Sequence, residues 1–320
     1  MRLYEVATKF SDERHCIEHL VNMRWPNGVK CVYCKSDWVA RYDTHGKTGK
    51  FRRVYECGDC HKQFTAQSGT LFHDSHLPLH KWFMAIALMC ESKKGMSAKQ
   101  LERALGVSYK TAWYLAHRIR EAMQDSDGFL SGIVEMDETY VGGKVKGKGH
   151  WEGRQNKTPV IGMRERGGKL KFIKTEDTKG TTIKSLVEQH ISKDVRVVMT
   201  DDSAIYPTLM KHKAIPHRIV THSRGEYVRY TKSGPIHTNT VESAFSLLKR
   251  GIIGTYHQLS SKHMQRYLHE FEWRFNRRKE QSAMHGLVLK NLAGCKGLPY
   301  KSLTRKTPLT SPATTETWPK

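Results

Sequence analysis

Three acidic side chains and one lysine have the chemistry of a divalent-metal site. Asp137 and Asp201 each end a strand-like run, and Glu242 lies in a helical segment that continues to Lys249. Seven residues fall only ~20° short of two full helical turns, so Glu242 and Lys249 share one face. Carboxylates are the hard oxygen ligands that Mg²⁺ or Mn²⁺ takes together with substrate phosphate. Three carboxylates backed by a cation therefore indicate phosphoryl transfer on nucleic acid.

The roles of the four residues follow from two-metal chemistry. Two ions ~3.5–4 Å apart activate an attacking oxygen and stabilise the leaving oxygen during an in-line displacement. We expect Asp137 to bridge both ions, Asp201 and Glu242 each to hold one, and Lys249 to contact phosphate. Each residue alone also has an ordinary explanation, since strand-end aspartates often form turns and Asn239 with Glu242 fits a capping box. Their order on strand, strand and helix favours the metal site.

Four of the seven cysteines form a second candidate metal site. Cys31-Val-Tyr-Cys34 and Cys57-Gly-Asp-Cys60 each place two thiols on a tight turn. Two such turns complete the tetrahedral sulfur shell of one structural Zn²⁺, as in a zinc ribbon. Redox chemistry is the alternative, but it needs only one such pair at a helix start. Nearby basic residues favour contact of the ribbon with DNA, although a purely structural role is the simpler explanation.

The charge balance indicates a polyanionic partner. The 320 residues carry 54 Lys and Arg against 31 Asp and Glu, a formal net charge of +23. A field of this size favours nucleic acid, and we expect double-stranded DNA. The longest apolar run, 82–90, is too short to cross a bilayer, and the N-terminal residues Met1 to Glu5 lack the apolar stretch expected of a signal peptide. These features predict a soluble, cytoplasmic protein, associated with the bacterial nucleoid and not with a membrane.

Changes in composition and hydrophobic periodicity along the chain predict its division into domains. The strand-like and helical runs after residue 128 predict a mixed α/β layer. The segments are a zinc ribbon over 1–75, a helical DNA-binding region over 76–127, an α/β domain over 128–285 and a partly disordered tail over 286–320.

A helix-turn-helix pattern lies in the second segment. Ser97–Leu105 reads as a first helix, Gly106 allows the turn, and Ser108 can cap the second helix. An ordinary helical hairpin with a basic solvated face is the alternative. The residues expected to face DNA from the second helix are Lys110, Trp113, Tyr114 and Arg118. Further expected DNA contacts are Lys144, Lys146 and Lys148, in a glycine-rich loop beside the acidic site, and Arg250, next to Lys249.

The motifs together resemble those of a known family. The segments that carry the resemblance are Cys57-x-x-Cys60, Glu135-x-Asp137-Glu138, Thr200-Asp201, His237-Thr-Asn-Thr-x-Glu242 and Leu248-Lys249-Arg250-Gly251. The chain is similar to DDE transposases of bacterial insertion sequences that have an N-terminal zinc ribbon and a ribonuclease-H-like catalytic domain. The resemblance extends from the first cysteine pair to about Arg278.

The resemblance implies a function as well as a fold. It implies a ribonuclease-H-like mixed sheet with flanking helices, recognition of terminal inverted repeats, 3′-strand cleavage by water, and attack of the freed 3′-hydroxyl on target DNA. The implied triad is Asp137, Asp201 and Glu242 with two Mg²⁺ or Mn²⁺ ions, and Lys249 is the basic residue after the glutamate. A homodimer or larger assembly on paired ends is expected. The alternatives are a non-catalytic zinc-ribbon DNA-binding protein, or a ribonuclease-H-like nuclease without joining activity.

Overall fold

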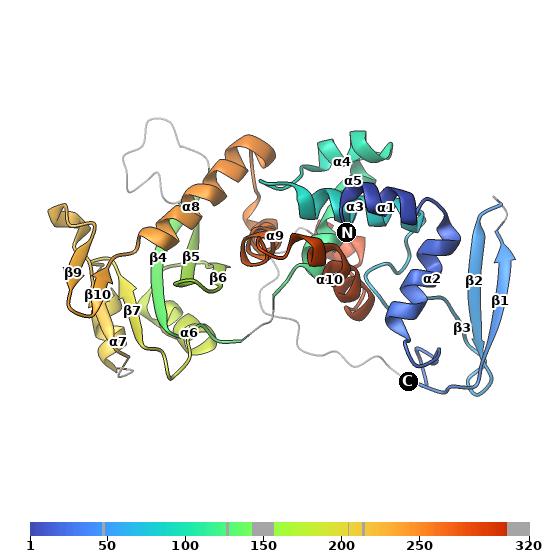
Figure 1. The fold of residues 1–320 in the computed structure, drawn as a ribbon, viewed down its shortest axis with the longest axis horizontal. Helices are drawn as coiled ribbons and strands as arrows, with labels where there is room; N and C mark the ends of the chain where they lie inside the picture. Colours follow the sequence, from blue (N-terminus) through green and yellow to red (C-terminus); the bar gives the residue numbers. More distant parts are fainter. Residues whose placement is uncertain (47–48, 126–127, 143–156, 204, 213–214, 306–320) are drawn as a thin grey trace.

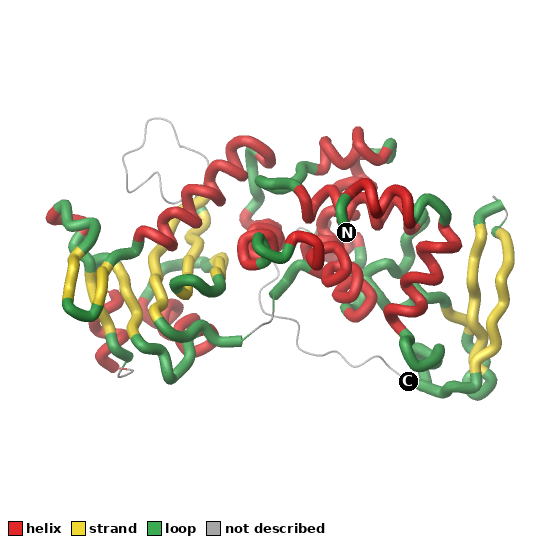
Figure 2. The backbone as a smooth tube through the Cα atoms, in the orientation of Figure 1, coloured by secondary structure: helices red, strands yellow, loops and turns green. Residues whose placement is uncertain are grey.

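The protein is elongated, with a helical body between its two larger sheets. The computed structural model describes residues 1–320 except 47–48, 126–127, 143–156, 204, 213–214 and 306–320. A three-stranded sheet lies at one end and a five-stranded sheet at the other, with most helices between them (Figure 1). Figure 2 shows the same division by secondary structure. The expected α/β fold class is confirmed.

The N-terminal part contains two helices that the sequence pattern did not predict. Helices α1 (Leu3–Lys9) and α2 (Glu13–Arg24) precede the antiparallel strands β1 (Val39–His45), β2 (Phe51–Cys57) and β3 (Gln63–Phe64). Helix α2 buries fully only Cys16 and Leu20, so its apolar stripe is too sparse to be recognised in the sequence. Both residues pack into the core of the central helical body, which anchors α2 there.

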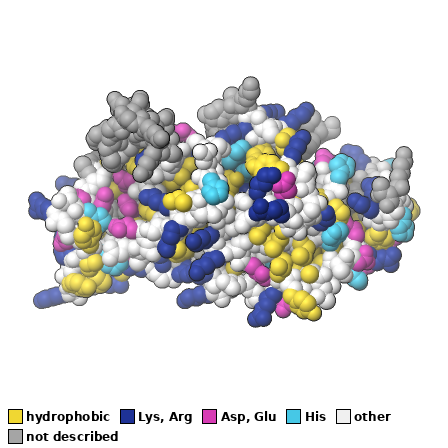
Figure 3. All heavy atoms as spheres, turned by 90° about the horizontal axis from the view of Figure 1, so that it is seen from above, with side chains coloured by type: hydrophobic (Ala, Val, Ile, Leu, Met, Phe, Trp, Pro, Cys, Tyr) yellow, Lys and Arg dark blue, Asp and Glu magenta, His cyan; other side chains and the backbone are white. Residues whose placement is uncertain are grey.

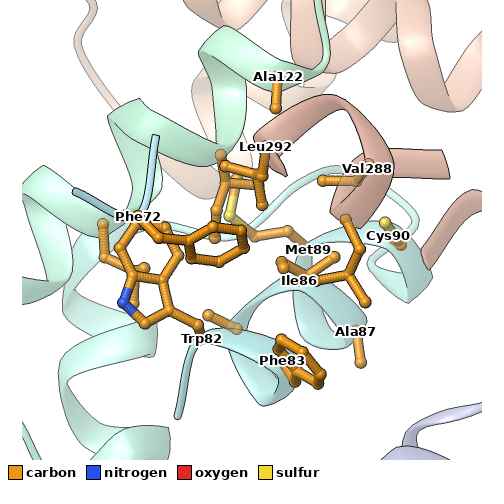
Figure 4. Packing of buried hydrophobic residues seen from close by; sticks show 14 of the residues in the cluster. Phe72, Trp82, Phe83, Ile86, Ala87, Met89, Cys90, Ala122, Val288 and Leu292 are labelled. Carbon is orange, nitrogen blue, oxygen red and sulfur yellow. The ribbon is translucent and has the colours of Figure 1, made fainter. Parts of the chain in front are cut away.

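The helical body is built from α3 (Leu79–Glu91), α4 (Ala98–Leu105), α5 (Tyr109–Ala122) and α10 (Gln281–Gly294). The α4–α5 turn has the predicted layout: Ser97 forms a capping box with Gln100, Gly106 is left-handed at φ 58°, and Ser108 accepts a hydrogen bond from the Thr111 amide at 3.2 Å. The core of the body joins aromatic residues of α3 to aliphatic residues of α10 (Figure 4).

The prediction of a partly disordered C-terminal tail over 286–320 is wrong for its first part. Residues 286–294 belong to α10, whose Val288, Leu289 and Leu292 are fully buried against α3 and α5. A short helix, α11 (Tyr300–Thr304), follows and covers part of α5. The buried residues of α10 lie three and four apart, but its apolar residues are spread around the helix, so the sequence carries little periodic signal for it. The remainder of the expected tail, 306–320, lies outside the described residues.

The five-stranded sheet has the mixed order expected of a ribonuclease-H-like domain. Its strands are β4 (Ile133–Val141), β5 (Thr158–Glu165), β6 (Leu170–Lys174), β7 (Val197–Thr200) and β8 (His217–Ile219), in the order β6-β5-β4-β7-β8. The pairs β4–β5 and β5–β6 are antiparallel, whereas β7 lies parallel to both β4 and β8. Helices α6 (Gly180–His190) and α7 (Ile205–His212) pack around the core cluster that includes residues of β4, β5 and β7.

The other sheet face is covered by α8 (Asn239–Gly251), which follows the small hairpin of β9 (Arg229–Thr231) and β10 (Gly234–Ile236). A π-helical segment, η3 (Ile252–Tyr256), continues α8 towards the helical body, and η4 (Ser261–His263) leads into α9 (Met264–Asn276).

Helix α9 joins the sheet to the helical body, because it contacts both β6 and α5. Between α5 and α9, Arg120 and Glu270 form a buried ion pair at 2.6 Å, to which Arg274 and the Tyr256 hydroxyl also contribute. In the described part of the chain, no helix is long and apolar enough to cross a membrane.

Candidate active site and metal centre

The two cysteine pairs lie on two turns of the same shape. The amide of Lys35 donates to the Cys31 carbonyl at 3.0 Å, and the amide of His61 donates to the Cys57 carbonyl at the same distance. Lys35 and His61 are both left-handed, with φ of 67° and 54°. Each turn therefore returns its second cysteine towards its first, and β2 carries Cys57 to the Cys31 turn.

The four sulfur atoms form one group. Cys31 Sγ lies 3.6 Å from Cys60 Sγ, Cys34 Sγ lies 3.4 Å from Cys57 Sγ, and all four lie within 4.8 Å of one another. A tetrahedral zinc with Zn–S bonds of about 2.3 Å needs sulfur separations of about 3.8 Å. Burial raises the pKa of Cys31, but hydrogen bonds from backbone amides and neighbouring thiols outweigh it and lower that pKa to about 7. The predicted zinc ligands thus fit structural Zn²⁺.

Asp137, in the middle of β4, and Asp201, directly after the parallel strand β7, line one pocket. The prediction that Asp137 ends a strand is wrong, because β4 continues to Val141 in its pairing with β5. Glu135 on β4 pairs with Met199 on β7, and extending both strands by two residues brings Asp137 level with Asp201. Neighbouring strands lie about 4.8 Å apart, and residues two apart on a strand face the same side. The register of the sheet and the shared pocket therefore bring both carboxylates to one place.

The aspartate next to Asp201 has a different environment. Asp201 lines a pocket of about 340 Å³ together with Asp137. Asp202 is exposed and accepts a hydrogen bond from the Ser223 hydroxyl, which lowers its pKa. Burial raises the pKa of Asp201, with the charges of Asp202 and Glu242 acting in the same direction. Of the two neighbours, Asp201 is the one placed to act with Asp137.

Glu242 reaches the edge of the same site from the first turn of α8. Its carboxylate accepts a hydrogen bond from Thr238 Oγ1 at 2.7 Å and lies 3.6 Å from His222 Nε2. The expected Asn239 capping box is wrong, because α8 begins after Thr238 and the Glu242 carboxylate bonds to the Thr238 hydroxyl. Two turns later, Lys249 lines the pocket, whereas Glu242 is not among the residues that line it.

A buried glutamate, Glu135, ties the start of α8 to the sheet. It is fully buried and accepts hydrogen bonds from the Thr240 amide at 2.8 Å, the Thr240 hydroxyl at 2.7 Å and the Val241 amide at 3.1 Å. Arg166 Nε donates to its other oxygen at 2.6 Å, and also binds the carbonyls of Pro235 and His237. A carboxylate at the amide end of a helix is stabilised by the helix dipole. Glu135 thereby fixes the helix that carries Glu242.

Gly162 on β5 lets α8 lie close to the sheet. It is the cross-strand partner of Asp137. A Cβ at this position would meet the Phe245 ring at 2.5 Å and Val241 Cγ2 at 2.9 Å. The missing side chain therefore sets the distance between α8 and the strand that carries Asp137.

Electrostatics at the site favour cation binding. Burial raises the pKa of Asp137 to about 7, and the charges of Glu138, Asp201 and Glu242 add to this, although the Glu138 amide donates to Asp137 at 2.8 Å. The four cysteine sulfurs are the described group of possible metal ligands whose atoms all lie within 4.8 Å of one another. The carboxylates of Asp137, Asp201 and Glu242 are therefore spaced more widely than the cysteine sulfurs. Figure 3 shows acidic side chains gathered in the half of the molecule that holds the five-stranded sheet, and Lys and Arg side chains towards its middle.

Four residues that shape the site were given no role from the sequence. Glu135 and Gly162 position α8, and Glu138 lines the pocket and accepts a hydrogen bond from the buried Tyr206 hydroxyl. The signal for Glu135 was present, because the strand period places it on the Asp137 face, where an isolated carboxylate needs a partner. Gly162 had no such signal, because its effect depends on the packing of α8.

The predicted DNA-facing side of α5 is largely covered, which corrects the prediction for Arg118 and its neighbours. Arg118 is only 3% exposed and donates to the Leu298 carbonyl, as does the Tyr114 hydroxyl. Trp113 packs against His117, His263 and Tyr300. The segment that covers these residues is the one expected to be a tail. Lys110 is exposed, with its ammonium 4.8 Å from the Tyr300 ring centre.

Of the remaining predicted DNA contacts, the structure describes Arg250 but not the three lysines of the glycine-rich loop. Arg250 is exposed beside Lys249, and its Nε donates to the Ser246 carbonyl at 3.3 Å. Lys144, Lys146 and Lys148 lie outside the described residues. Lys157, at the described end of that loop, lines the same pocket as the acidic residues and brings a second cation to it.

Comparisons with known proteins match both halves of the chain. A transposase zinc-ribbon domain matches residues 11–63, and an ISXO2-like transposase domain matches residues 129–276. The chain is 31% identical over 280 residues to an uncharacterised protein in transposable element ISH50 of Halobacterium salinarum, covering 83% of this chain and 91% of that protein. A chain in the structure of a simian T-cell lymphotropic virus intasome in complex with PP2A regulatory subunit B56 gamma shares 14% identity, covers 69% of this chain and 79% of that chain, and gives a TM-score of 0.30, too weak a likeness to support a conclusion.

Proposed function

This chain belongs to the ISXO2-like transposases, and from that premise we propose that it binds the terminal inverted repeats of its insertion sequence, cleaves the 3′ strands and joins them to target DNA. The zinc ribbon identified by the four cysteines would stabilise the N-terminal sheet. A dimer or larger assembly would hold the paired ends.

The observation that carries the proposal is that Asp137 on β4 and Asp201 after β7 line one pocket together with Lys249 and Lys157. Binding alone does not require two half-buried carboxylates beside each other, because their repulsion and desolvation cost free energy. A divalent cation removes that cost, and the lysines supply positive charge for a phosphodiester. This charge pattern fits metal-dependent phosphoryl transfer.

The residues present fit the metal ions that the family implies. All the candidate ligands are carboxylates, the donor type that Mg²⁺ and Mn²⁺ prefer. Asp137 would contact both ions, Asp201 and Glu242 one each, and Lys249 would bind a phosphate oxygen. When bound, the ions supply activation of the attacking oxygen and charge stabilisation of the leaving oxygen. Thr238 donates to only one of the two Glu242 oxygens, so the carboxylate can keep this hydrogen bond and hold a cation with its other oxygen.

The test compares Asp137→Asn with Asp202→Asn on DNA that carries the ends of the element. Asp137→Asn is expected to abolish nicking with Mg²⁺ or Mn²⁺ while DNA binding survives. Asp202→Asn is the matched control, since Asp202 is exposed and bonded to Ser223, and it is expected to keep nicking. Nicking by Asp137→Asn at the wild-type rate would remove Asp137 from the active site.

The same assay separates the alternatives. DNA binding without nicking by the wild-type protein would identify a non-catalytic DNA-binding protein. Nicking without joined products, when target DNA is supplied, would identify a nuclease without joining activity.

A further inference from the structure

A second groove lies at the far end of the helix that carries Glu242. It has a volume of about 580 Å³ and lies between the α4–α5 turn and the segment that follows α8. Lys99, Arg103 and Tyr109 line it from the α4–α5 side, and Thr255, His257 and Gln258 line it from the other side. Of the predicted recognition face of α5 the groove includes Trp113, and it shares no lining residue with the acidic pocket.

The groove is polar and positively charged. None of the described residues that line it is acidic, in contrast to the active-site pocket. Lys99 is two-thirds exposed and pairs with Glu102 at 2.7 Å, an exposed pair that contributes little and can exchange for a phosphate. The Lys99 ammonium also lies 5.2 Å from the Tyr109 ring centre. This combination of cations and hydroxyl and amide side chains suits phosphodiester oxygens.

The backbone of the groove is strained on the α8 side. Helix α8 ends in a π-helical turn, and the next residue, His257, has φ 61° and ψ −51° although it is not glycine. His257 is nevertheless exposed, so no tight packing requires this conformation. Strain kept at an exposed, groove-lining position is typical of functional segments.

The length of α8 relates the two sites. Thr255 follows Glu242 by 13 residues, which is about 20 Å along a helix. Duplex DNA rises 3.4 Å per base pair, so the same length corresponds to about six base pairs. Figure 1 shows α8 running from the five-stranded sheet to the helical body without interruption. One duplex lying along α8 can therefore reach both sites.

We propose that this groove binds the phosphate backbone of duplex DNA about six base pairs from the cleaved bond, with Lys99 and Arg103 as the contacting cations. The inference rests on the proposed function. Because phosphate contacts fix register without reading sequence, the groove would set the position of the cut relative to the recognised repeat.

The test uses the full-length protein and an element-end duplex, with salt-dependent binding and hydroxyl-radical footprinting as readouts. The double variant Lys99→Ala/Arg103→Ala is expected to lower the salt slope of log affinity by about two, because two phosphate contacts are lost. It is also expected to lose protection about six base pairs from the cut while keeping protection at the cut. The matched control is Lys184→Ala/Lys193→Ala, which removes two exposed lysines in and after α6 and is expected to leave both readouts unchanged.

A second variant keeps the inference testable if the double variant folds poorly. Gln258→Glu adds an acid at an exposed position of the groove and is expected to weaken binding at low salt by about tenfold. Wild-type salt slope and protection in the correctly folded double variant, or wild-type affinity at low salt in Gln258→Glu, would overturn the proposed binding of DNA in the groove. Absence of metal-dependent nicking by the wild-type protein would instead overturn the proposed function.

Discussion

Gly162 faces the ring of Phe245, and a Cβ on this glycine would meet the ring at 2.5 Å. Because Gly162 also pairs across the strands with Asp137, this contact connects the position of α8 to the acidic site. We predict that Gly162→Ala lifts α8, destabilises the fold by about 1–3 kcal/mol and lowers the nicking rate although no carboxylate changes.

Gly286→Ala is the control for that substitution. Gly286 lies within α10, and a Cβ added there would meet nothing within 4 Å, so alanine should be tolerated or slightly stabilising. Thermal unfolding and a nicking assay measure both effects. Wild-type nicking by a folded Gly162→Ala protein would show that the height of α8 above the sheet does not matter.

Glu135 is predicted to act through the helix that it holds. Glu135→Gln leaves Arg166 without its charged partner and weakens the contact with the α8 amides, so we expect a loss of about 3 kcal/mol and weaker Mn²⁺ binding. Glu176→Gln removes an exposed partner of Lys174 and is expected to cost less than about 1 kcal/mol. Calorimetric Mn²⁺ titration separates the two roles, since unchanged Mn²⁺ affinity in Glu135→Gln would leave Glu135 a structural role only.

The raised pKa of Asp137 predicts that the metal-free protein becomes less stable as this carboxyl group loses its proton. Without metal, the folded state holds the Asp137 proton up to about pH 7, whereas the unfolded state releases it near pH 3.8. The folded state binds more protons in this window, so this contribution makes the protein less stable as pH rises from about 4 to 7. Metal-free Asp137→Asn should therefore be more stable than wild type at pH 8, by a few kcal/mol at most.

Mn²⁺ should reverse that order, because only the wild-type carboxylate binds the ion. Its affinity should fall by up to tenfold per unit as pH decreases below about 7, since the proton must leave first. Denaturant unfolding with and without Mn²⁺ measures both trends. A metal-free Asp137→Asn protein that is less stable than wild type at pH 8 would contradict the assignment.

Loss of zinc is predicted to unfold the N-terminal sheet but not the helix before it. Cys57→Ser should abolish zinc binding and expose the β1–β2 amides to hydrogen exchange, because structural zinc contributes folding free energy. Helix α2 should stay protected, since Cys16 and Leu20 pack in the helical body. Cys295→Ser, outside both cysteine turns, is the control and should retain zinc. Unchanged exchange at β2 after zinc loss would show that the sheet folds without metal.

The sequence predicted the features that depend on local period and spacing. The Ser97, Gly106 and Ser108 signals located the α4–α5 turn, and the apolar run before Asp201 located the end of β7, whereas Asp137 proved to lie within β4 and not at its end. What it did not predict depends on segments distant in the chain. Arg118 was expected at a DNA surface, but Leu298, 180 residues later, accepts its hydrogen bond. No periodicity in α5 contains that information.

The ion pair of Arg120 with Glu270 affects the distance between the bound repeat of the element and the bond that is cut. Both side chains are almost completely buried, so separating them would leave an unpaired charge away from water at a cost of several kcal/mol. The two helices that they connect are therefore expected to move as a unit, and the gap between a bound repeat and the scissile phosphate becomes a fixed length. Insertions or deletions of single base pairs in that interval of the element would be rejected by geometry, whatever their sequence.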